Sequence, residues 1–181
     1  MKEQRDKYML LEEYHRFIKV CPLQYILFWK ICFNAGLRVS ECLNLTVQDI
    51  LYSENKLLIK TLKRKGHPIF PIIIPGNLIK ELEEYIQKYE ITNRIWPFSR
   101  QFAFKIFKQV CKKAHLNSNY SPHAARHFHG VMIADLTNGN MIEIKTRLRH
   151  ASIRSTEFYI HCSEQRQKEL SNKIENYLKG G

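Results

Sequence analysis

"KLLIKTLKRKGHPIFPIII", Lys56 to Ile74, is the stretch that shows most directly which class of fold to expect. Its two apolar runs, Lys56 to Leu62 and Ile69 to Ile74, are joined by the basic segment "KRKGHP". Two short aliphatic runs around a glycine-containing connection predict a β-hairpin with a basic tip. Pro71 has no N–H to donate to a neighbouring strand, so we expect the second strand at the edge of its sheet.

The sequence on both sides of this hairpin is expected to be helical. Leu23 to Ala35 is apolar nearly all round, which predicts a helix buried on most faces that ends at Gly36. Capping residues and helical spacing predict further helices after Ser40, after Pro75, after Ser99 (with Phe104, Phe107, Val110 and Ala114 inward), from Ser121-Pro122 to Asn138, and over 141–148, 155–161 and 164–178. The predicted fold is α+β, mainly α, in one domain with a small antiparallel sheet.

The chain is strongly basic. It has 29 Lys and Arg against 17 Asp and Glu, a net charge of +12. Such an excess favours a polyanionic partner, nucleic acid first and an anionic membrane surface second, although a basic surface can also serve solubility alone. The most apolar run, Tyr25 to Phe33, contains Lys30 and is too short to span a bilayer. We therefore expect a cytoplasmic protein that binds DNA and does not reside in a membrane.

The cysteines argue against a metal or disulfide framework. They are odd in number and never spaced as C-x-x-C: Cys21, Cys32, Cys42, Cys111 and Cys162. We expect reduced, buried thiols. The sequence also lacks a phosphate-cradling glycine loop and an acidic cluster suited to magnesium, so no cofactor and no metal are predicted.

Three separated segments carry polar residues that neither a core nor a solvated face explains well. They are Arg38 in "AGLRVSE", His123 and Arg126 in "SPHAARH", and His150 and Tyr159 in "LRHASIRSTEFYIH". Each residue alone has an ordinary explanation, such as an ion pair between Arg38 and Glu41. His123 and Arg126 are spaced i and i+3, which places them on one helical face.

Together, these segments resemble the tyrosine recombinases, also called the phage integrase family. "GLRVSECLNLTVQDI" (36–50) is similar to the family's first box, "HAARH" (123–127) to its H-x-x-R box, and "LRHASIRSTEFY" (148–159) to its L-G-H…Y box. The resemblance runs from about Leu23 to His161. It implies a helical DNA breaking-rejoining catalytic domain over residues 1–181.

The resemblance also implies roles for individual residues. Tyr159 would be the nucleophile, and the other catalytic residues would be Arg38, Lys63, His123, Arg126 and His150. Arg64, Lys65, Arg149 and Arg154 would contact DNA. Lys63 lies eight residues before Pro71, as the family's catalytic lysine precedes its proline, and Lys65 is the rival. The chain departs from the family at Arg149, where a glycine is usual, and at Ala125 and Phe128-His129.

These residue types suit attack at phosphorus. Guanidiniums present a planar fork of donors to phosphate oxygens on which charge develops. A tyrosine, with a pKa of about 10, needs a proton acceptor or a strongly cationic site. A lysine can protonate the leaving 5′ oxygen. The expected activity is site-specific cutting and rejoining of double-stranded DNA through a 3′-phosphotyrosyl intermediate, without metal or ATP.

Three alternatives remain open from the sequence. They are a type IB topoisomerase or telomere resolvase, a non-catalytic DNA-binding module of the same fold, and an RNA-binding helical domain, which would need exposed aromatic stacking platforms. Only 37 residues precede Arg38, whereas the family carries a separate helical domain upstream, so the resemblance implies a catalytic fragment. It also implies a monomer in solution, a homotetramer on DNA, and a C-terminal segment, 164–181, that docks on a neighbouring protomer.

Overall fold

A computed structural model describes residues 8–61, 66, 68–150, 152, 171 and 174–175 of the chain. Within them lie seven α-helices: α2 (Leu11–Val20), α3 (Leu23–Ala35), α4 (Val39–Leu43), α5 (Gly76–Lys88), α6 (Arg100–Lys113), α7 (His123–Leu136) and α8 (Met141–Leu148). The strands are β1 (Ile50–Leu51), β2 (Lys56–Lys60) and β3 (Ile69–Ile73), and short 3₁₀ helices, η1 (Val47–Asp49) and η2 (Tyr52–Glu54), flank β1. The predicted fold class, mainly α with a small antiparallel sheet, is confirmed.

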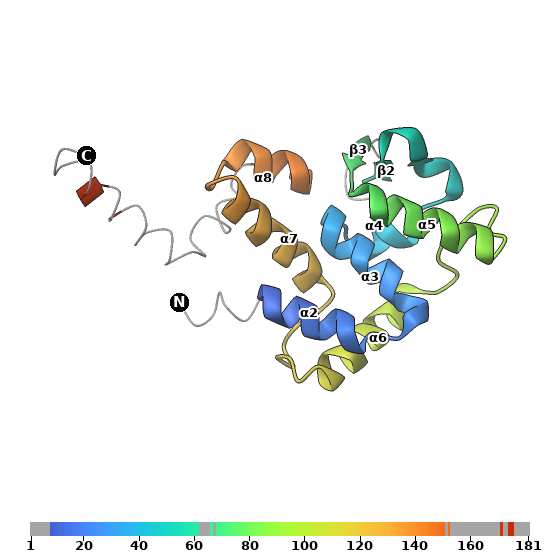
Figure 1. Cartoon of the computed structure of the whole chain (residues 1–181), viewed down its shortest axis with the longest axis horizontal. Helices are drawn as coiled ribbons and strands as arrows, with labels where there is room; N and C mark the ends of the chain where they lie inside the picture. Colours follow the sequence, from blue (N-terminus) through green and yellow to red (C-terminus); the bar gives the residue numbers. More distant parts are fainter. Residues whose placement is uncertain are drawn as a thin grey trace.

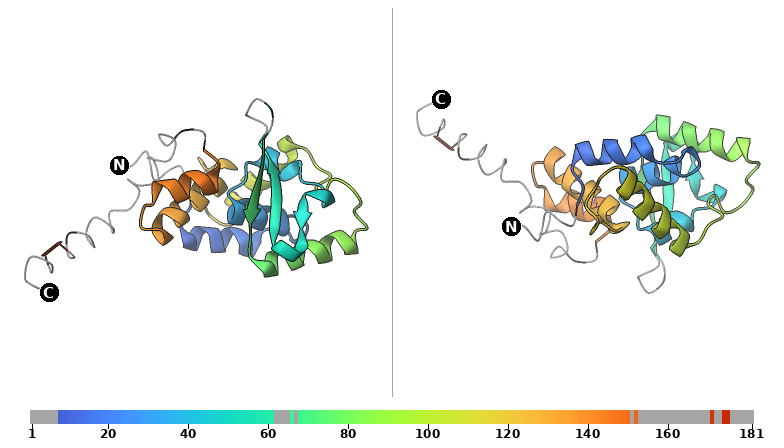
Figure 2. Two further views of the ribbon diagram at one scale, coloured as in Figure 1. Left: turned by 90° about the horizontal axis from the view of Figure 1, so that it is seen from above. Right: turned by 90° about the horizontal axis from the view of Figure 1, so that it is seen from below.

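Helix α3 is the central element. Its buried residues are Leu27, Phe28, Trp29, Ile31, Cys32, Phe33 and Ala35. Figure 1 shows α7 and α8 on one side of α3, with α5 and the sheet on the other, and Figure 2 shows the same division from above and below. A helix that is apolar on nearly every face needs several neighbours to bury it. Its predicted end at Gly36 is confirmed by the left-handed backbone there, with φ 58°.

Aromatic contacts fix α7 against α2 and α3. Phe33 meets Phe128 edge-on with ring centroids 5.5 Å apart, and Tyr14 stacks on Phe128 at 5.1 Å. Such pairs contribute about 0.5–1.5 kcal/mol beyond the area they bury. They hold the helix that carries His123 and Arg126 against the C-terminal end of α3.

The predicted hairpin is present, within a sheet of order β1-β2-β3 whose pairs are both antiparallel. Leu58 lies opposite Pro71, which places the proline on an edge strand as predicted. Strand β1 was not predicted, because a run of two residues is too short to show an alternating pattern. Leu57 and Ile59 of β2 are buried and turn one face of the sheet toward the helices.

Several predicted helix boundaries differ in detail. Ser40 does not cap α4; Arg38 occupies the N-cap position and its backbone N–H bonds to the Glu41 carboxylate. Helix α7 begins at His123, with Pro122 as its N-cap, and ends at Leu136 rather than at Asn138. Helix α2 was not predicted.

The predicted cap of α6 is confirmed, since Ser99 Oγ accepts the N–H of Phe102 at 3.1 Å. Phe104 was wrongly assigned to the inward face, because its side chain is 47% exposed. The other three predicted residues, Phe107, Val110 and Ala114, are buried, and they are joined on the buried face by Ala103, Ile106 and Cys111. Phe104 instead lines the pocket described below.

The segments 155–161 and 164–178, both expected to be helices, lie outside the described residues except for 171 and 174–175. The described thiols are free and buried, as predicted, at Cys21, Cys32, Cys42 and Cys111, whereas Cys162 is not described. Where the structure describes the chain, it contains no group of three potential metal ligands, and no helix is long and apolar enough to cross a membrane.

Candidate active site

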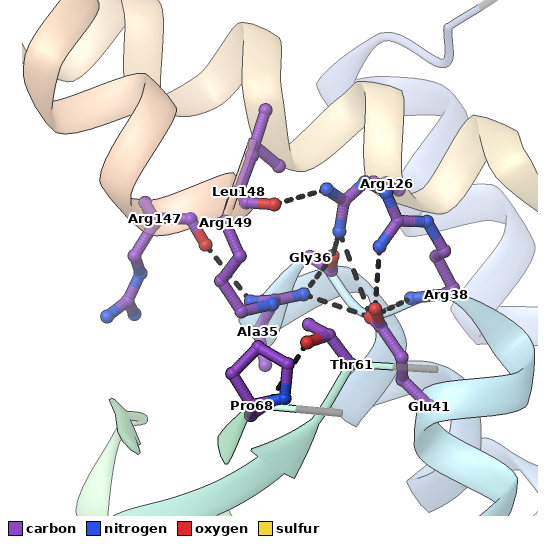
Figure 3. Close-up of polar contacts among 10 residues, drawn as sticks. All are labelled: Ala35, Gly36, Arg38, Glu41, Thr61, Pro68, Arg126, Arg147, Leu148 and Arg149. Atoms are coloured by element: carbon purple, nitrogen blue, oxygen red, sulfur yellow. Dashed lines mark hydrogen bonds and ion pairs between the residues drawn. The ribbon is translucent and has the colours of Figure 1, made fainter. Parts of the chain in front are cut away.

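Three arginine side chains converge on the carboxylate of Glu41, which is only 3% exposed (Figure 3). Arg38 donates from Nη1 to Oε1 at 2.6 Å, and its backbone N–H donates to Oε2 at 2.9 Å. Arg149 donates from Nη2 to Oε2 at 3.1 Å. Arg126 is farther away, with Nη1 3.9 Å from Oε2. Three guanidinium groups around one carboxylate give this cluster a net formal charge of +2.

Arg126 joins all three sequence boxes. It comes from α7, donates from Nη1 to the carbonyl of Gly36 at 2.7 Å, and donates from Nη2 to the carbonyl of Leu148. Gly36 ends α3 and Leu148 ends α8, so one guanidinium bridges segments that are far apart in sequence. The two carbonyls orient a guanidinium that is itself buried, since Arg126 is 5% exposed.

A pocket opens beside this cluster, between the starts of α4, α6 and α7. Its lining residues are Arg38, Val39, Ser40, Arg100, Phe104, Ser121, Pro122 and His123. His123 is exposed and the Arg38 side chain is 21% exposed, so both reach solvent there. Helices α6 and α7 both begin at the pocket, and helix N-termini carry partial positive charge. The pocket is therefore suited to an anion.

Glu41 is ionised despite its burial. Burial alone would raise the pKa of this carboxyl, but Arg149, the backbone N–H of Arg38, and the charges of Arg126 and Arg38 more than offset that effect and lower it. An ionised Glu41 can hold several guanidiniums close together, which would otherwise repel one another.

His150 is neutral at physiological pH. Partial burial, followed by the positive charges of Arg126, Arg38 and Arg149, lowers the pKa of His150 to about 4. A neutral imidazole can donate one hydrogen bond and accept another, but it brings no charge. Its pKa reflects its closeness to the arginine cluster, in agreement with the expectation that it belongs to this site.

The structure thus brings together four of the predicted site residues: Arg38, His123, Arg126 and His150. The ion pair between Arg38 and Glu41, considered above as an ordinary explanation, is also present. Outside the described residues lie Lys63, Arg64, Lys65, Arg154 and Tyr159. Their roles, and the choice between Lys63 and Lys65, stay predictions.

Arg149 differs from its expected role as a DNA contact. Its side chain is 1% exposed. Besides Glu41, its guanidinium bonds to the carbonyls of Ala35, Gly36 and Arg147, at 3.3, 3.1 and 3.1 Å. This burial and the ion pair with Glu41 contradict the expectation of an exposed basic side chain that contacts DNA.

Two residues of the site were missed from the sequence. Glu41 was considered only as a partner of Arg38, although its position three residues after Arg38 in a buried turn was a usable signal. Arg100 lines the pocket with Arg38 and His123. Its only signal was a basic residue directly after the cap of a helix.

The sequence of the chain is similar to that of known proteins over most of its length. The sequence model of the phage integrase family matches residues 7–166. The chain belongs to the phage integrase family. Among its relatives, the tyrosine recombinase XerD of Staphylococcus saprophyticus is 26% identical over 161 residues, which cover 80% of this chain and 52% of that protein. The tyrosine recombinase XerA of Pyrococcus furiosus is 28% identical over 186 residues, 93% of this chain and 63% of that protein.

Solved structures show the same integrase-family fold. The crystal structure of XerA recombinase superposes with a TM-score of 0.78 at 20% identity, covering 92% of this chain and 64% of that chain. The catalytic domain of bacteriophage HP1 integrase gives a TM-score of 0.70 at 18% identity. The match covers 92% of this chain and 94% of that domain. The chain therefore spans nearly all of an isolated catalytic domain, but only about half of XerD, at 52%.

Proposed function

We propose that this chain is the catalytic domain of a site-specific tyrosine recombinase that cuts and rejoins double-stranded DNA. The observation that carries the proposal is the meeting of three sequence boxes at one cationic pocket, where Arg38 and His123 reach solvent beside Arg126 and His150. A phosphodiester is an anion that gains charge during attack at phosphorus, and preorganised donors stabilise that charge.

Arg38 and Arg126 bind the non-bridging oxygens of the phosphate that is cut. The Tyr159 hydroxyl loses its proton to a base, for which His123 is placed at the pocket, and its oxygen forms a bond to phosphorus. The bond from phosphorus to the 5′ oxygen breaks, and Lys63 supplies a proton to that oxygen. Neutral His150 donates a hydrogen bond to the phosphate. The 3′-phosphotyrosyl link retains the bond energy, so a second DNA end can reverse the step.

The proposed partner is double-stranded DNA in the cytoplasm. The net charge of +12 supports a polyanionic partner. Two proteins of the same fold were solved with DNA: the XerH site-specific recombinase bound to its difH substrate, and the Tn1549 transposon integrase in complex with transposon right end DNA. We further propose a monomer in solution and a homotetramer on DNA, with residues 164–181 docked on a neighbouring protomer.

A nicked suicide substrate tests this function without knowledge of the target sequence. The protein is incubated with a pool of nicked duplexes that carry a randomised segment. In these duplexes, cleavage near the nick releases a short fragment and traps the covalent complex. We expect adducts that resist denaturing detergent, enriched in one sequence family. Folded protein that binds DNA and forms no adduct would instead indicate a non-catalytic module. Relaxation of supercoiled plasmid without sequence preference would indicate a topoisomerase.

A further inference from the structure

The backbone at Arg149 has a conformation that rarely accepts a side chain. Its φ is 54°, in the left-handed region that favours glycine. The Arg149 N–H bonds to Thr146 O and the His150 N–H to Lys145 O, both at 3.0 Å, the pair of bonds by which a left-handed residue ends a helix. An arginine occupies this position although a glycine would fit with less strain, so we looked for a role of the side chain.

The side chain of Arg149 turns back into the protein. It is 1% exposed and bonds to Glu41 and to the carbonyl of Gly36, each at 3.1 Å. Burying a guanidinium is costly unless it is well paired. Strain in the backbone and a buried charge therefore coincide at one residue, a combination found at functional sites.

Arg149 and Arg126 share their acceptors. The Gly36 carbonyl accepts from Arg126 at 2.7 Å and from Arg149 at 3.1 Å. Oε2 of Glu41 lies 3.1 Å from Arg149 but 3.9 Å from Arg126. Oε2 already accepts from the Arg38 backbone N–H at 2.9 Å and from Arg149 at 3.1 Å, so both of its lone pairs are used and Arg126 stays outside hydrogen-bond distance. A movement of about 1 Å would bring Arg126 within hydrogen-bond distance of the same oxygen, since N–H···O bonds lie near 2.9 Å.

We propose that Arg149 is a positioning residue that occupies Oε2 of Glu41 and so prevents Arg126 from closing into a hydrogen-bonded ion pair with it. Arg126 then keeps its hydrogen bonds to the carbonyls of Gly36 and Leu148, and its ion pair with Glu41 stays long, at 3.9 Å, so that a phosphate group can compete for the guanidinium. The inference deepens the proposed function and rests on it for the reaction. The binding of an anion at Arg126 is separable from catalysis and can be measured without DNA.

The test compares Arg149→Gly, Arg149→Lys, Glu41→Gln and the double variant Arg149→Gly/Glu41→Gln. The probe is inorganic phosphate at neutral pH, titrated against the full chain while the arginine side-chain NMR signals are followed. We expect Arg149→Gly to weaken phosphate binding at least tenfold and Arg149→Lys to restore part of it. In the Glu41→Gln background the glycine substitution should change affinity less than twofold, because a neutral amide does not capture Arg126.

Two variants serve as matched controls. Asn138→Gly relieves another left-handed position, with φ 51°, which unlike Arg149 is exposed, and it removes no contact to Glu41. Arg147→Ala removes a positive charge two residues before Arg149. The Arg147 guanidinium donates to Ile73 O at 2.7 Å. Both should bind phosphate within twofold of wild type and melt as a single transition.

Unchanged phosphate affinity in Arg149→Gly overturns the proposal. An equal loss of phosphate affinity with Glu41 and with Glu41→Gln also overturns it, because Arg149 would then act only through its charge or through folding. If Glu41→Gln does not fold, the crystal structure of Arg149→Gly decides. Contact of Arg126 with Glu41 below about 3.2 Å supports the proposal, and a separation that stays at 3.9 Å overturns it. A wild type that binds phosphate but forms no DNA adduct would defeat the proposed function and leave this result standing.

Discussion

The Arg126 guanidinium donates to the carbonyl of Gly36 at 2.7 Å, and this bond joins α7 to the turn that ends α3. Gly36 can offer that carbonyl because its backbone is left-handed, with φ 58°. The same residue accepts a hydrogen bond from Arg149. The turn after α3 therefore ends the helix and also supplies a carbonyl that two arginines of the cluster share.

Substitution at Gly36 should be costly for two separate reasons. Gly36→Ala places a Cβ in a left-handed residue and 2.6 Å from Cδ2 of the buried His129. Gly66 is the matched control, because it is also left-handed, at φ 81°, but an added Cβ there meets nothing within 4 Å. We expect a loss of about 1 kcal/mol for Gly66→Ala and about 2–4 kcal/mol for Gly36→Ala. Urea unfolding measures both, and equal losses would contradict the predicted clash.

Arg38→Ala should slow formation of the covalent DNA adduct by about 10²–10³-fold, as expected for loss of one preorganised donor. Its side chain reaches the pocket, and its removal leaves Glu41 with Arg149 and Arg126. Single-turnover cleavage at saturating DNA measures the effect. The control Lys19→Ala, at the end of α2, should cleave at the wild-type rate. A rate for Arg38→Ala within tenfold of wild type would remove Arg38 from the catalytic group.

Arg100→Ala should weaken DNA binding without abolishing cleavage, because Arg100 lines the pocket at the start of α6. A lost phosphate contact should reduce the slope of log affinity against log salt by about 1. Lys113→Ala, at the other end of the same helix, is the charge-matched control. The two variants should differ in slope when binding is titrated at several salt concentrations. Identical slopes would argue that DNA does not approach the start of α6.

Acid should destabilise the protein through His129. Burial, followed by the charge of Arg147, lowers the pKa of His129 to about 3, while Nδ1 bonds to Phe33 O at 2.9 Å. The unfolded chain binds this proton below about pH 6.5 and the folded chain does not until about pH 3. The contribution of His129 to stability should therefore be complete above pH 6.5 and fall by about 1.4 kcal/mol per pH unit below it.

Urea unfolding at pH 7 and pH 5 measures that slope. His129→Asn, whose amide can still donate to Phe33 O, should show a flatter dependence. His150, with a pKa also lowered to about 4, contributes in the same direction and remains in the variant. Equal slopes in wild type and His129→Asn would show that His129 does not control acid stability.

The hairpin, the central apolar helix and the site residues Arg38, His123, Arg126 and His150 were all predictable from sequence. Local patterns define the hairpin and the helix, and the resemblance of three short boxes to one family predicted that these four residues lie close together. The position of Arg149 was not predictable. Its burial depends on acceptors more than 100 residues away, such as Glu41 at a separation of 108, so its sequence neighbourhood suggested only an exposed basic residue.

The most direct test of the central claim is identification of the residue that carries DNA. Wild-type protein is trapped on the nicked suicide duplex, digested with protease and nuclease, and mapped by mass spectrometry. We predict one modified peptide, with a 3′-phosphonucleotide on Tyr159, and no adduct in Tyr159→Phe although that variant still folds and binds DNA. An adduct that persists in Tyr159→Phe, or one mapped to another residue, would contradict the account.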